Sequence, residues 1–298
     1  MQKPANFIFL IALSTLSVFS GASAQSALSV SAKSSLGVSA QSTPSFTVQI
    51  QGSGTQPLVL LPGFACSGEV WKETVARYGS RYKCYVLTMA GFAGATPQAE
   101  PDLHTWVKDI AAYIQQNHLN KPVIIGHSMG GGMAMILAAT YPTLVGKIIV
   151  VDALPCLNAL MNPAFTAAEH PDCASIIGQM TQMTDDQFAG MQKMTMPRLM
   201  ADTVHLAQVI QWSKSSDRKT FGSMYCQYSN EDMRATIAAI TCPALILMES
   251  PFGNYKPAIE AQFKKLTTAN IQYAGHGLHF IMYDDKDWYF QQTDSFLQ

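Results

Sequence analysis

The 298-residue sequence has little charge, and its few charges nearly cancel. Charged side chains make up 13% of the chain, as 19 lysines and arginines against 20 aspartates and glutamates. The lack of a basic excess argues against binding to nucleic acid or to an anionic membrane surface. A disordered chain combines high charge with few apolar residues, whereas 48% of this sequence is hydrophobic. We therefore expect a folded protein with no nucleic-acid partner.

Long apolar runs are also scarce, and the one candidate lies at the start of the chain. Lys3 is followed by an apolar stretch from Phe7 to Leu13 and then by small residues ending at Ala24. A membrane anchor needs about 18–20 nearly continuous apolar residues, and serines and a threonine interrupt this stretch. The pattern is typical of a signal peptide. We expect cleavage after residues 1–24, a periplasmic or secreted protein, and no stable membrane insertion.

The sequence has no C-x-x-C pair and no Cys/His cluster with the spacing of a metal site, so we expect no metal and no other cofactor. In an oxidising compartment, however, the six cysteines could form disulfides. The pair that we consider first is Cys156 with Cys173, because both lie in one segment between predicted strands. Buried free thiols are the alternative.

The rest of the chain divides by composition. Residues 25–45 contain eight serines, which predicts a flexible leader. From residue 46 to residue 298, short apolar runs alternate with helix-length amphipathic segments. This alternation is typical of an α/β domain with a mostly parallel central sheet and helices on both faces. The apolar runs lie at residues 57–61, 84–88, 122–125, 147–151, 244–248 and 270–273.

The alternation stops between residues 154 and 240. This stretch has the pattern of helices and holds nine of the sixteen methionines. We predict a helical cap inserted between two strands of the sheet. Methionine side chains adapt to irregular apolar ligands, which would suit a lid over a binding site, and ordinary core packing is their alternative use.

A candidate nucleophile lies in Gly126-His-Ser-Met-Gly130, which matches the pattern G-x-S-x-G. The motif follows an apolar run that ends at Ile125 and precedes a helix-competent segment. A sharp strand-to-helix turn exposes the serine hydroxyl, and the flanking glycines let strand and helix approach closely. We predict that Ser128 is a nucleophile; a glycine-rich packing turn is the alternative.

With this motif in place, residues 46–298 resemble the α/β-hydrolase superfamily, in its serine esterase-like branch with a helical cap. Leu60-Leu-Pro-Gly-Phe64 is similar to the oxyanion loop of the family, with Pro62 where histidine is common. The resemblance implies an oxyanion hole formed by the backbone N–H groups of Phe64 and Met129. Such donors stabilise the negative charge of a tetrahedral intermediate.

Two histidines compete as the base that activates the serine. Both follow the last predicted strand, where the family keeps its base. His279 opens a His-Phe-hydrophobic-acidic run that resembles the family pattern, so we favour His279. His276, between two glycines, is the alternative base.

The acid departs from the pattern of most relatives, in which an aspartate follows the strand at 244–248. In this chain the expected position of that aspartate falls near Phe252, and the usual aspartate is absent there. Some branches place the acid after the preceding strand, where this chain has Asp152. We therefore choose Asp152, with Glu249 as the alternative acid and the lack of a working acid as the third possibility.

These residues together predict an exported carboxylesterase that acts on small to medium apolar esters through an acyl-enzyme at Ser128. The expected partner is a small-molecule ester, and nothing in the sequence indicates an oligomeric state. Amide or lactone hydrolysis and perhydrolysis would use the same site. A non-catalytic ligand-binding protein on a hydrolase scaffold is the alternative from another class.

Overall fold

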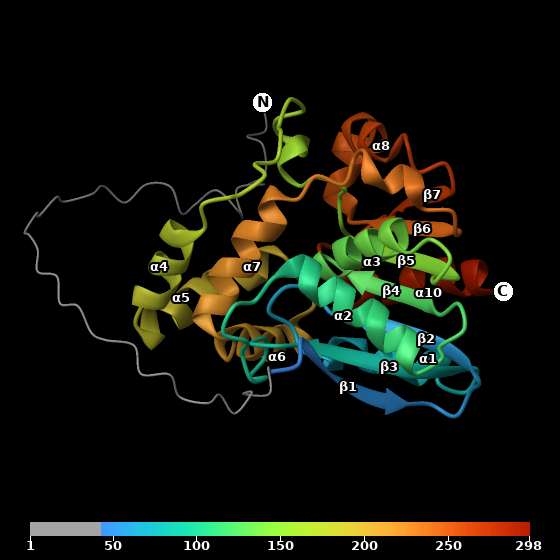
Figure 1. Ribbon diagram of the computed structural model, residues 1–298, viewed down its shortest axis with the longest axis horizontal. Helices are drawn as coiled ribbons and strands as arrows, with labels where there is room; N and C mark the ends of the chain where they lie inside the picture. The colour runs from blue at the N-terminus through green and yellow to red at the C-terminus, as the bar shows by residue number, and fades with distance from the viewer. Residues whose placement is uncertain (1–42) are drawn as a thin grey trace, which may run out of the picture. The chain divides into compact units, whose positions relative to one another are not determined.

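The computed structural model describes residues 43–298, which contain a seven-stranded sheet (Figure 1). The strand order is β1-β3-β2-β4-β5-β6-β7; β1 is antiparallel to β3, and all other pairs are parallel. The strands are β1 (Phe46–Gln51), β2 (Gln56–Leu61), β3 (Tyr82–Met89), β4 (Val123–His127), β5 (Lys147–Val151), β6 (Ala244–Met248) and β7 (Ala269–Tyr273). The predicted signal peptide and the predicted leader up to residue 42 lie outside the described residues.

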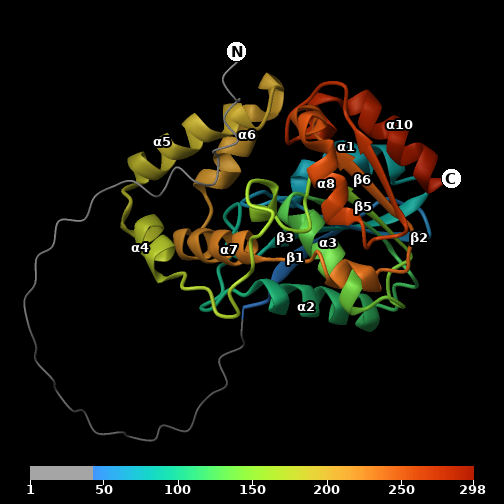
Figure 2. The same ribbon diagram turned by 90° about the horizontal axis from the view of Figure 1, so that it is seen from above.

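Helices cover both faces of the sheet (Figure 2). Helices α1 (Lys72–Tyr78) and α10 (Lys286–Leu297) pack together on one face, where Thr74 contacts the hydroxyl of Tyr289 at 3.1 Å. Helices α2 (Leu103–Gln116) and α3 (Met129–Thr140) lie on the other face. The remaining helices of the main domain are α8 (Lys256–Phe263) and the short α9 (Ile281–Asp284). Short 3-10 helices occur at Gly68–Trp71, Asn158–Leu160, Met196–Arg198, Thr236–Ala239 and Ser250–Tyr255.

The central strands are apolar because both of their faces are buried. All five residues of β6 are buried, as are four of the five residues of β5. The register sets His127 beside Val151 and Val151 beside Leu247. Residues that follow these strands therefore emerge at one edge of the sheet, where ligands bind in open α/β sheets.

A helical cap is inserted between β5 and β6, as predicted. It consists of α4 (Ala174–Gln182), α5 (Asp185–Thr195), α6 (Thr203–Lys214) and α7 (Arg218–Asn230), which group together beside the sheet (Figure 1). The mostly parallel sheet, the helices on both faces and the inserted cap confirm the predicted fold class. None of the helices in residues 43–298 is long and apolar enough to span a membrane.

The disulfide of the cap differs from the expected pair of Cys156 with Cys173. Cys173, which precedes α4, is bonded to Cys226 of α7, with their Cα atoms 5.6 Å apart. Cys156 is a buried free thiol whose backbone N–H donates to the Gln262 side chain of α8 at 3.0 Å. The prediction was wrong because α4 folds back along α7, whereas Cys156 remains at the main domain.

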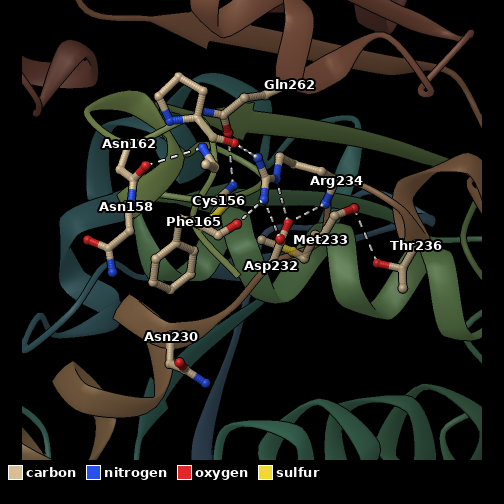
Figure 3. A network of polar contacts seen from close by, with 12 residues as sticks. Cys156, Asn158, Asn162, Phe165, Asn230, Asp232, Met233, Arg234, Thr236 and Gln262 are labelled. Carbon is tan, nitrogen blue, oxygen red and sulfur yellow. Dashed lines mark hydrogen bonds and ion pairs between the residues drawn. The ribbon is translucent and has the colours of Figure 1, made fainter. Parts of the chain in front are cut away.

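One arginine joins the two segments that connect the cap to the sheet (Figure 3). Arg234, on the returning segment, donates to the carbonyl oxygens of Pro163 at 2.9 Å and Phe165 at 2.6 Å on the departing segment. Its guanidinium also pairs with Asp232, at 2.7 Å and 2.8 Å. These bonds hold the base of the cap closed; we refer to them as the Arg234 clasp.

Candidate active site

Ser128 occupies a strained turn between β4 and α3. Its φ is 53° and its ψ is −122°, in a region that residues other than glycine rarely adopt. The Ser128 N–H donates to the carbonyl of Val151 at 2.8 Å, and its carbonyl accepts from Gly132 at 3.0 Å. Ser128 is partly exposed between the buried His127 and Met129. The chain thus presents the serine at the edge of the sheet, while its backbone is held on both sides.

Both glycines of the motif are required by close backbone packing. A Cβ atom at Gly126 would overlap the carbonyl oxygen of Gly130. A Cβ atom at Gly130 would overlap the carbonyl oxygen of Leu61 on β2. The strand-turn-helix context that gives the G-x-S-x-G motif its meaning is therefore present.

The loop after β2 lies against this turn. A Cβ atom built on Gly63 would be 3.3 Å from Ser128 Cβ, which places the backbone before Phe64 beside the serine. Met129 is the first residue of α3, so its N–H has no partner within the helix. Within residues 43–298, neither the N–H of Phe64 nor that of Met129 forms a backbone–backbone hydrogen bond of the kind found in turns, loops and helix caps. Two donors near a helix N-terminus suit a developing negative charge, and their oxyanion role stays a prediction.

Asp152 and His279 are in direct contact. His279 Nδ1 lies 2.6 Å from Asp152 Oδ2, and Asp152 Oδ1 accepts the backbone N–H of Glu249 at 2.7 Å. The Asp152 side chain is 1% exposed and that of His279 is 21% exposed. Because the carboxylate binds Nδ1–H, the neutral imidazole carries its lone pair on Nε2. The arrangement leaves a proton acceptor on the side of the ring away from Asp152.

The environment of Asp152 acts on its pKa in two directions. Burial raises the pKa of Asp152, and the hydrogen bond from His279 and the N–H of Glu249 oppose that rise. The backbone is also constrained, since Asp152 has a φ of 54° directly after β5. Asp152 thus contacts the histidine from a strained backbone position.

The alternative acid and the alternative base are placed differently. Glu249 contributes its backbone N–H to Asp152, and burial together with the charges of Asp152 and Asp284 raises the pKa of its side chain to about 9. A carboxyl group that is neutral at pH 7 provides no counter-charge for an imidazolium. His276 is exposed, and its backbone N–H is 3.5 Å from Asp285 Oδ2. Phe252, near the usual position of the acid, is buried.

Tyr228 of the cap was not foreseen from the sequence. Its hydroxyl lies 3.4 Å from the carbonyl oxygen of Ser128, and a Cβ atom at Gly132 would overlap its ring. The cap helix α7 therefore contacts the turn of Ser128 directly. No signal near Ser128 could have revealed a residue one hundred positions further along the chain.

Asp284 was also missed, although it closes the His-Phe-hydrophobic-acidic run. Its carboxylate accepts the N–H of Leu278 at 2.8 Å, which holds the loop that carries His279. The same carboxylate accepts the N–H groups of Ala201 at 3.0 Å and Asp202 at 2.8 Å, both from the cap. One side chain thus joins the histidine loop to the cap. The acidic position of the run was the available signal.

Aromatic side chains surround the predicted oxyanion residue. The Phe64 ring makes edge contacts with Phe92, Phe221 and Tyr225, at centroid distances of 5.2, 4.5 and 6.3 Å. Phe221 also contacts Phe188 of the cap at 5.2 Å. Phe64, Phe221 and Tyr225 are partly exposed. They form an apolar surface, here called the aromatic wall, between the loop after β2 and α7.

Comparison with known proteins places this geometry in a family. Residues 56–205 match the family described as alpha/beta hydrolase fold, and the chain belongs to that family. A similar protein is the pimeloyl-[acyl-carrier protein] methyl ester esterase of Aliivibrio fischeri, 23% identical over 210 residues, which cover 67% of this chain and 77% of the relative. The enzyme of the same name from Aeromonas hydrophila is 34% identical over 118 residues, or 38% of this chain and 44% of the relative.

Solved structures show the same fold at low sequence identity. An esterase from Exiguobacterium antarcticum aligns with a TM-score of 0.68 and 19% identity, covering 84% of this chain and 94% of that protein. An enol-lactonase from Burkholderia xenovorans aligns with a TM-score of 0.69 and 13% identity, covering 85% and 96%. No group of three or more His, Cys, Asp or Glu residues in the described part of the chain is arranged to hold a metal ion.

Proposed function

We propose that this protein is an exported serine hydrolase, a carboxylesterase that cleaves small to medium apolar esters through an acyl-enzyme at Ser128. The observation that carries the proposal is the 2.6 Å contact between His279 Nδ1 and Asp152 Oδ2. Asp152 emerges at the same edge of the sheet as the strained turn of Ser128. Membership of the alpha/beta hydrolase fold family and relatives that are named esterases add support.

In the proposed reaction, the Ser128 hydroxyl attacks the ester carbonyl while its proton passes to His279 Nε2. Asp152 stabilises the imidazolium through Nδ1–H. The backbone N–H groups of Phe64 and Met129 bind the oxyanion of the tetrahedral intermediate. His279 returns the proton to the departing alkoxide, which leaves the acyl group on the serine. Water, deprotonated by the same imidazole, then attacks the acyl carbonyl. The imidazolium returns this proton to the departing Ser128 oxygen, which releases the carboxylic acid and regenerates the serine hydroxyl.

The aromatic wall supports an apolar substrate. Phe64, Phe221 and Tyr225 are partly exposed next to the predicted oxyanion loop. An acyl chain that packs on these rings would remove apolar surface from water, which stabilises binding by about 25 cal/mol per Å². We therefore place the acyl group of the substrate along the aromatic wall.

The charge of the cap supports a free small-molecule ester over an ester attached to an acidic partner protein. Residues 154–240 contain six lysines and arginines against eight aspartates and glutamates. Three of these cations are in ion pairs: Arg218 with Asp185, Lys219 with Glu100, and Arg234 with Asp232. A cap with this balance has no cationic excess for an acidic partner, so we propose a small molecule as the substrate.

The location of the activity, periplasmic or secreted, is part of the proposal. Its support is the signal-peptide pattern of residues 1–24. The Cys173–Cys226 disulfide also suits an oxidising compartment. Expression of the full chain with cell fractionation tests this point, since the mature protein should leave the cytoplasm with an N-terminus at Gln25.

A panel of nitrophenyl esters of increasing acyl length tests the enzymatic proposal. Wild type should hydrolyse acetyl to hexanoyl esters, with KM falling as the chain lengthens along the aromatic wall. Ser128→Ala should lose turnover, whereas Ser175→Ala, a change at an exposed serine of α4, should behave like wild type. Equal hydrolysis by wild type and Ser128→Ala would contradict the proposal.

Further substrates separate the related activities. Nitroanilides and lactones of matched acyl length measure amide and lactone hydrolysis, and an assay with hydrogen peroxide measures perhydrolysis. We expect kcat/KM to be highest for the esters. A folded wild type that binds esters without cleaving them would favour the ligand-binding alternative.

A further inference from the structure

His127 is a buried histidine that the proposed reaction does not use. It fills the variable position of the motif directly before Ser128 and is 1% exposed. Its Nε2 lies 2.9 Å from the carbonyl oxygen of His279. Since a carbonyl oxygen can only accept, Nε2 must carry the proton and donate. The residue before the nucleophile is therefore hydrogen-bonded to the backbone of the base.

The His127 ring also contacts the side chains around the base. Its centroid is 4.7 Å from the His279 ring and 4.7 Å from the Phe280 ring. His127 therefore contacts His279 both through ring packing and through the hydrogen bond to its carbonyl. His279 is thus held at two points: Asp152 binds its imidazole, and His127 binds its backbone carbonyl.

The opposite side of His127 faces the predicted oxyanion loop. A Cβ atom at Gly63 would lie 2.6 Å from His127 Nδ1, so the ring lies directly against that loop. Nδ1 is buried, and in residues 43–298 it has no hydrogen-bond partner. Burial and the nearby His279 lower the pKa of His127 well below its usual value, which keeps the ring neutral. A buried acceptor without a partner costs folding free energy that an apolar residue would avoid.

We propose that His127 is a positioning residue. The hydrogen bond from its Nε2–H to the His279 carbonyl fixes the loop of His279 relative to the turn of Ser128 and to the predicted oxyanion loop. This inference rests on the proposed function of Ser128 and His279. His127 is the last residue of β4, so its position follows that of the nucleophile. A shift of the base by about 1 Å can reduce turnover by about a hundredfold, which makes such a link useful.

Two pairs of variants separate hydrogen bonding from packing. In His127→Phe, the phenyl ring fills the space of the imidazole but cannot donate a hydrogen bond. In His127→Gln, the side chain is long enough to place an amide N–H near the position of Nε2. We expect His127→Phe to lower kcat by about 10- to 100-fold with KM within about twofold of wild type, and His127→Gln to retain most of kcat. His127→Asn, whose amide is too short to reach the His279 carbonyl, should behave like His127→Phe. The comparison of His127→Gln with His127→Asn keeps the test valid if His127→Phe does not fold.

Imidazole ¹H–¹⁵N spectra provide a readout that does not depend on turnover. In wild type, the Nδ1–H proton of His279 should give a downfield signal and exchange slowly with solvent. Nε2 of His127 should be protonated. The downfield proton should broaden or shift in His127→Phe and His127→Asn but remain in His127→Gln. If no Ser128-dependent hydrolysis is found, the proposed function fails while these spectra still test the position of His279. An unshifted proton in all three variants, or equal kcat in the glutamine and asparagine variants, would overturn the inference.

Discussion

His279 Nδ1 lies 2.6 Å from Asp152 Oδ2, although the two residues are 127 positions apart in the chain. The contact forms because Asp152 follows β5 and the His279 loop follows β7, and these strands belong to one parallel sheet. Strand β5 is hydrogen-bonded to β4, the strand that leads into the turn of Ser128. We propose that Asp152 is the acid of the site; the position after β6, where most relatives were expected to keep their acid, holds the buried Phe252 in this chain.

Asp152→Asn should lower kcat by a factor of the order of 10³–10⁴, because the amide cannot stabilise an imidazolium and favours the wrong histidine tautomer. The measurement is steady-state hydrolysis of a nitrophenyl ester. Asp186→Asn, at an exposed position of α5, is the matched control and should retain wild-type kcat. Near-normal turnover of Asp152→Asn would show that Asp152 is not the catalytic acid.

Glu249 should make the stability of the protein fall as pH rises. Burial and the charges of Asp152 and Asp284 raise the pKa of its carboxyl from 4.5 to about 9. The folded protein keeps a proton that the unfolded chain releases, so the free energy of unfolding decreases as pH rises from about 4.5 to about 9. Glu249→Gln removes this effect, and its Tm should exceed that of wild type by an amount that grows with pH.

Thermal melts of both proteins at about pH 5 and about pH 8 check this. Each kcal/mol gained should raise Tm by about 2–4 °C in a domain of this size. A constant Tm difference between the two pH values would show that Glu249 titrates normally. Retention of ester hydrolysis by Glu249→Gln would separately exclude it as the acid.

The Cys173–Cys226 disulfide should stabilise the cap by about 2–4 kcal/mol, because it closes a loop of 53 residues. The double variant Cys173→Ser/Cys226→Ser should melt about 4–16 °C below wild type under non-reducing conditions. Cys242→Ala changes a buried free cysteine and serves as the control for loss of a sulfur atom. Equal Tm values for wild type and the double variant would contradict the stabilising role.

Arg234→Met should loosen the cap at its base. The substitution removes the guanidinium that donates to the carbonyl groups of Pro163 and Phe165 and to Asp232. The Asp232 carboxylate keeps the backbone N–H of residue 234, whereas the two carbonyl groups lose this donor. Each group left unpaired costs about 1–3 kcal/mol when it stays buried, and less where water can reach it. Limited proteolysis should cut the cap of this variant faster than that of wild type. Arg198→Met, at an exposed position, should be cut at the wild-type rate.

Much of the fold could be predicted because parallel strands are continuous apolar runs. Residues 147–151 and 244–248 were predicted as strands and form β5 and β6 within the same limits. The turn of Ser128 was also readable, since Gly126 and Gly130 are needed for local packing next to it. These features depend on residues close together in the chain.

The features that escaped prediction depend on how the cap folds onto the sheet. Tyr228 reaches the Ser128 carbonyl only because α7 packs on α3, and Asp284 binds the cap only because residues 201–202 lie beside it. The expected disulfide was wrong for the same reason. Cys156 and Cys173 were paired because both lie in the segment between two predicted strands, whereas the packing of α4 along α7 brings Cys173 to Cys226. Long-range contacts of this kind have no local sequence pattern.

The most direct measurement for the central proposal is labelling by a fluorophosphonate, followed by intact mass and peptide mapping. Wild type should gain one phosphonyl group per chain on Ser128, and Ser128→Ala should gain none. Asp152→Asn should react more slowly than wild type, because its histidine is a weaker base for the serine hydroxyl. A folded wild type that remains unlabelled, or that is labelled at another residue, would contradict the account.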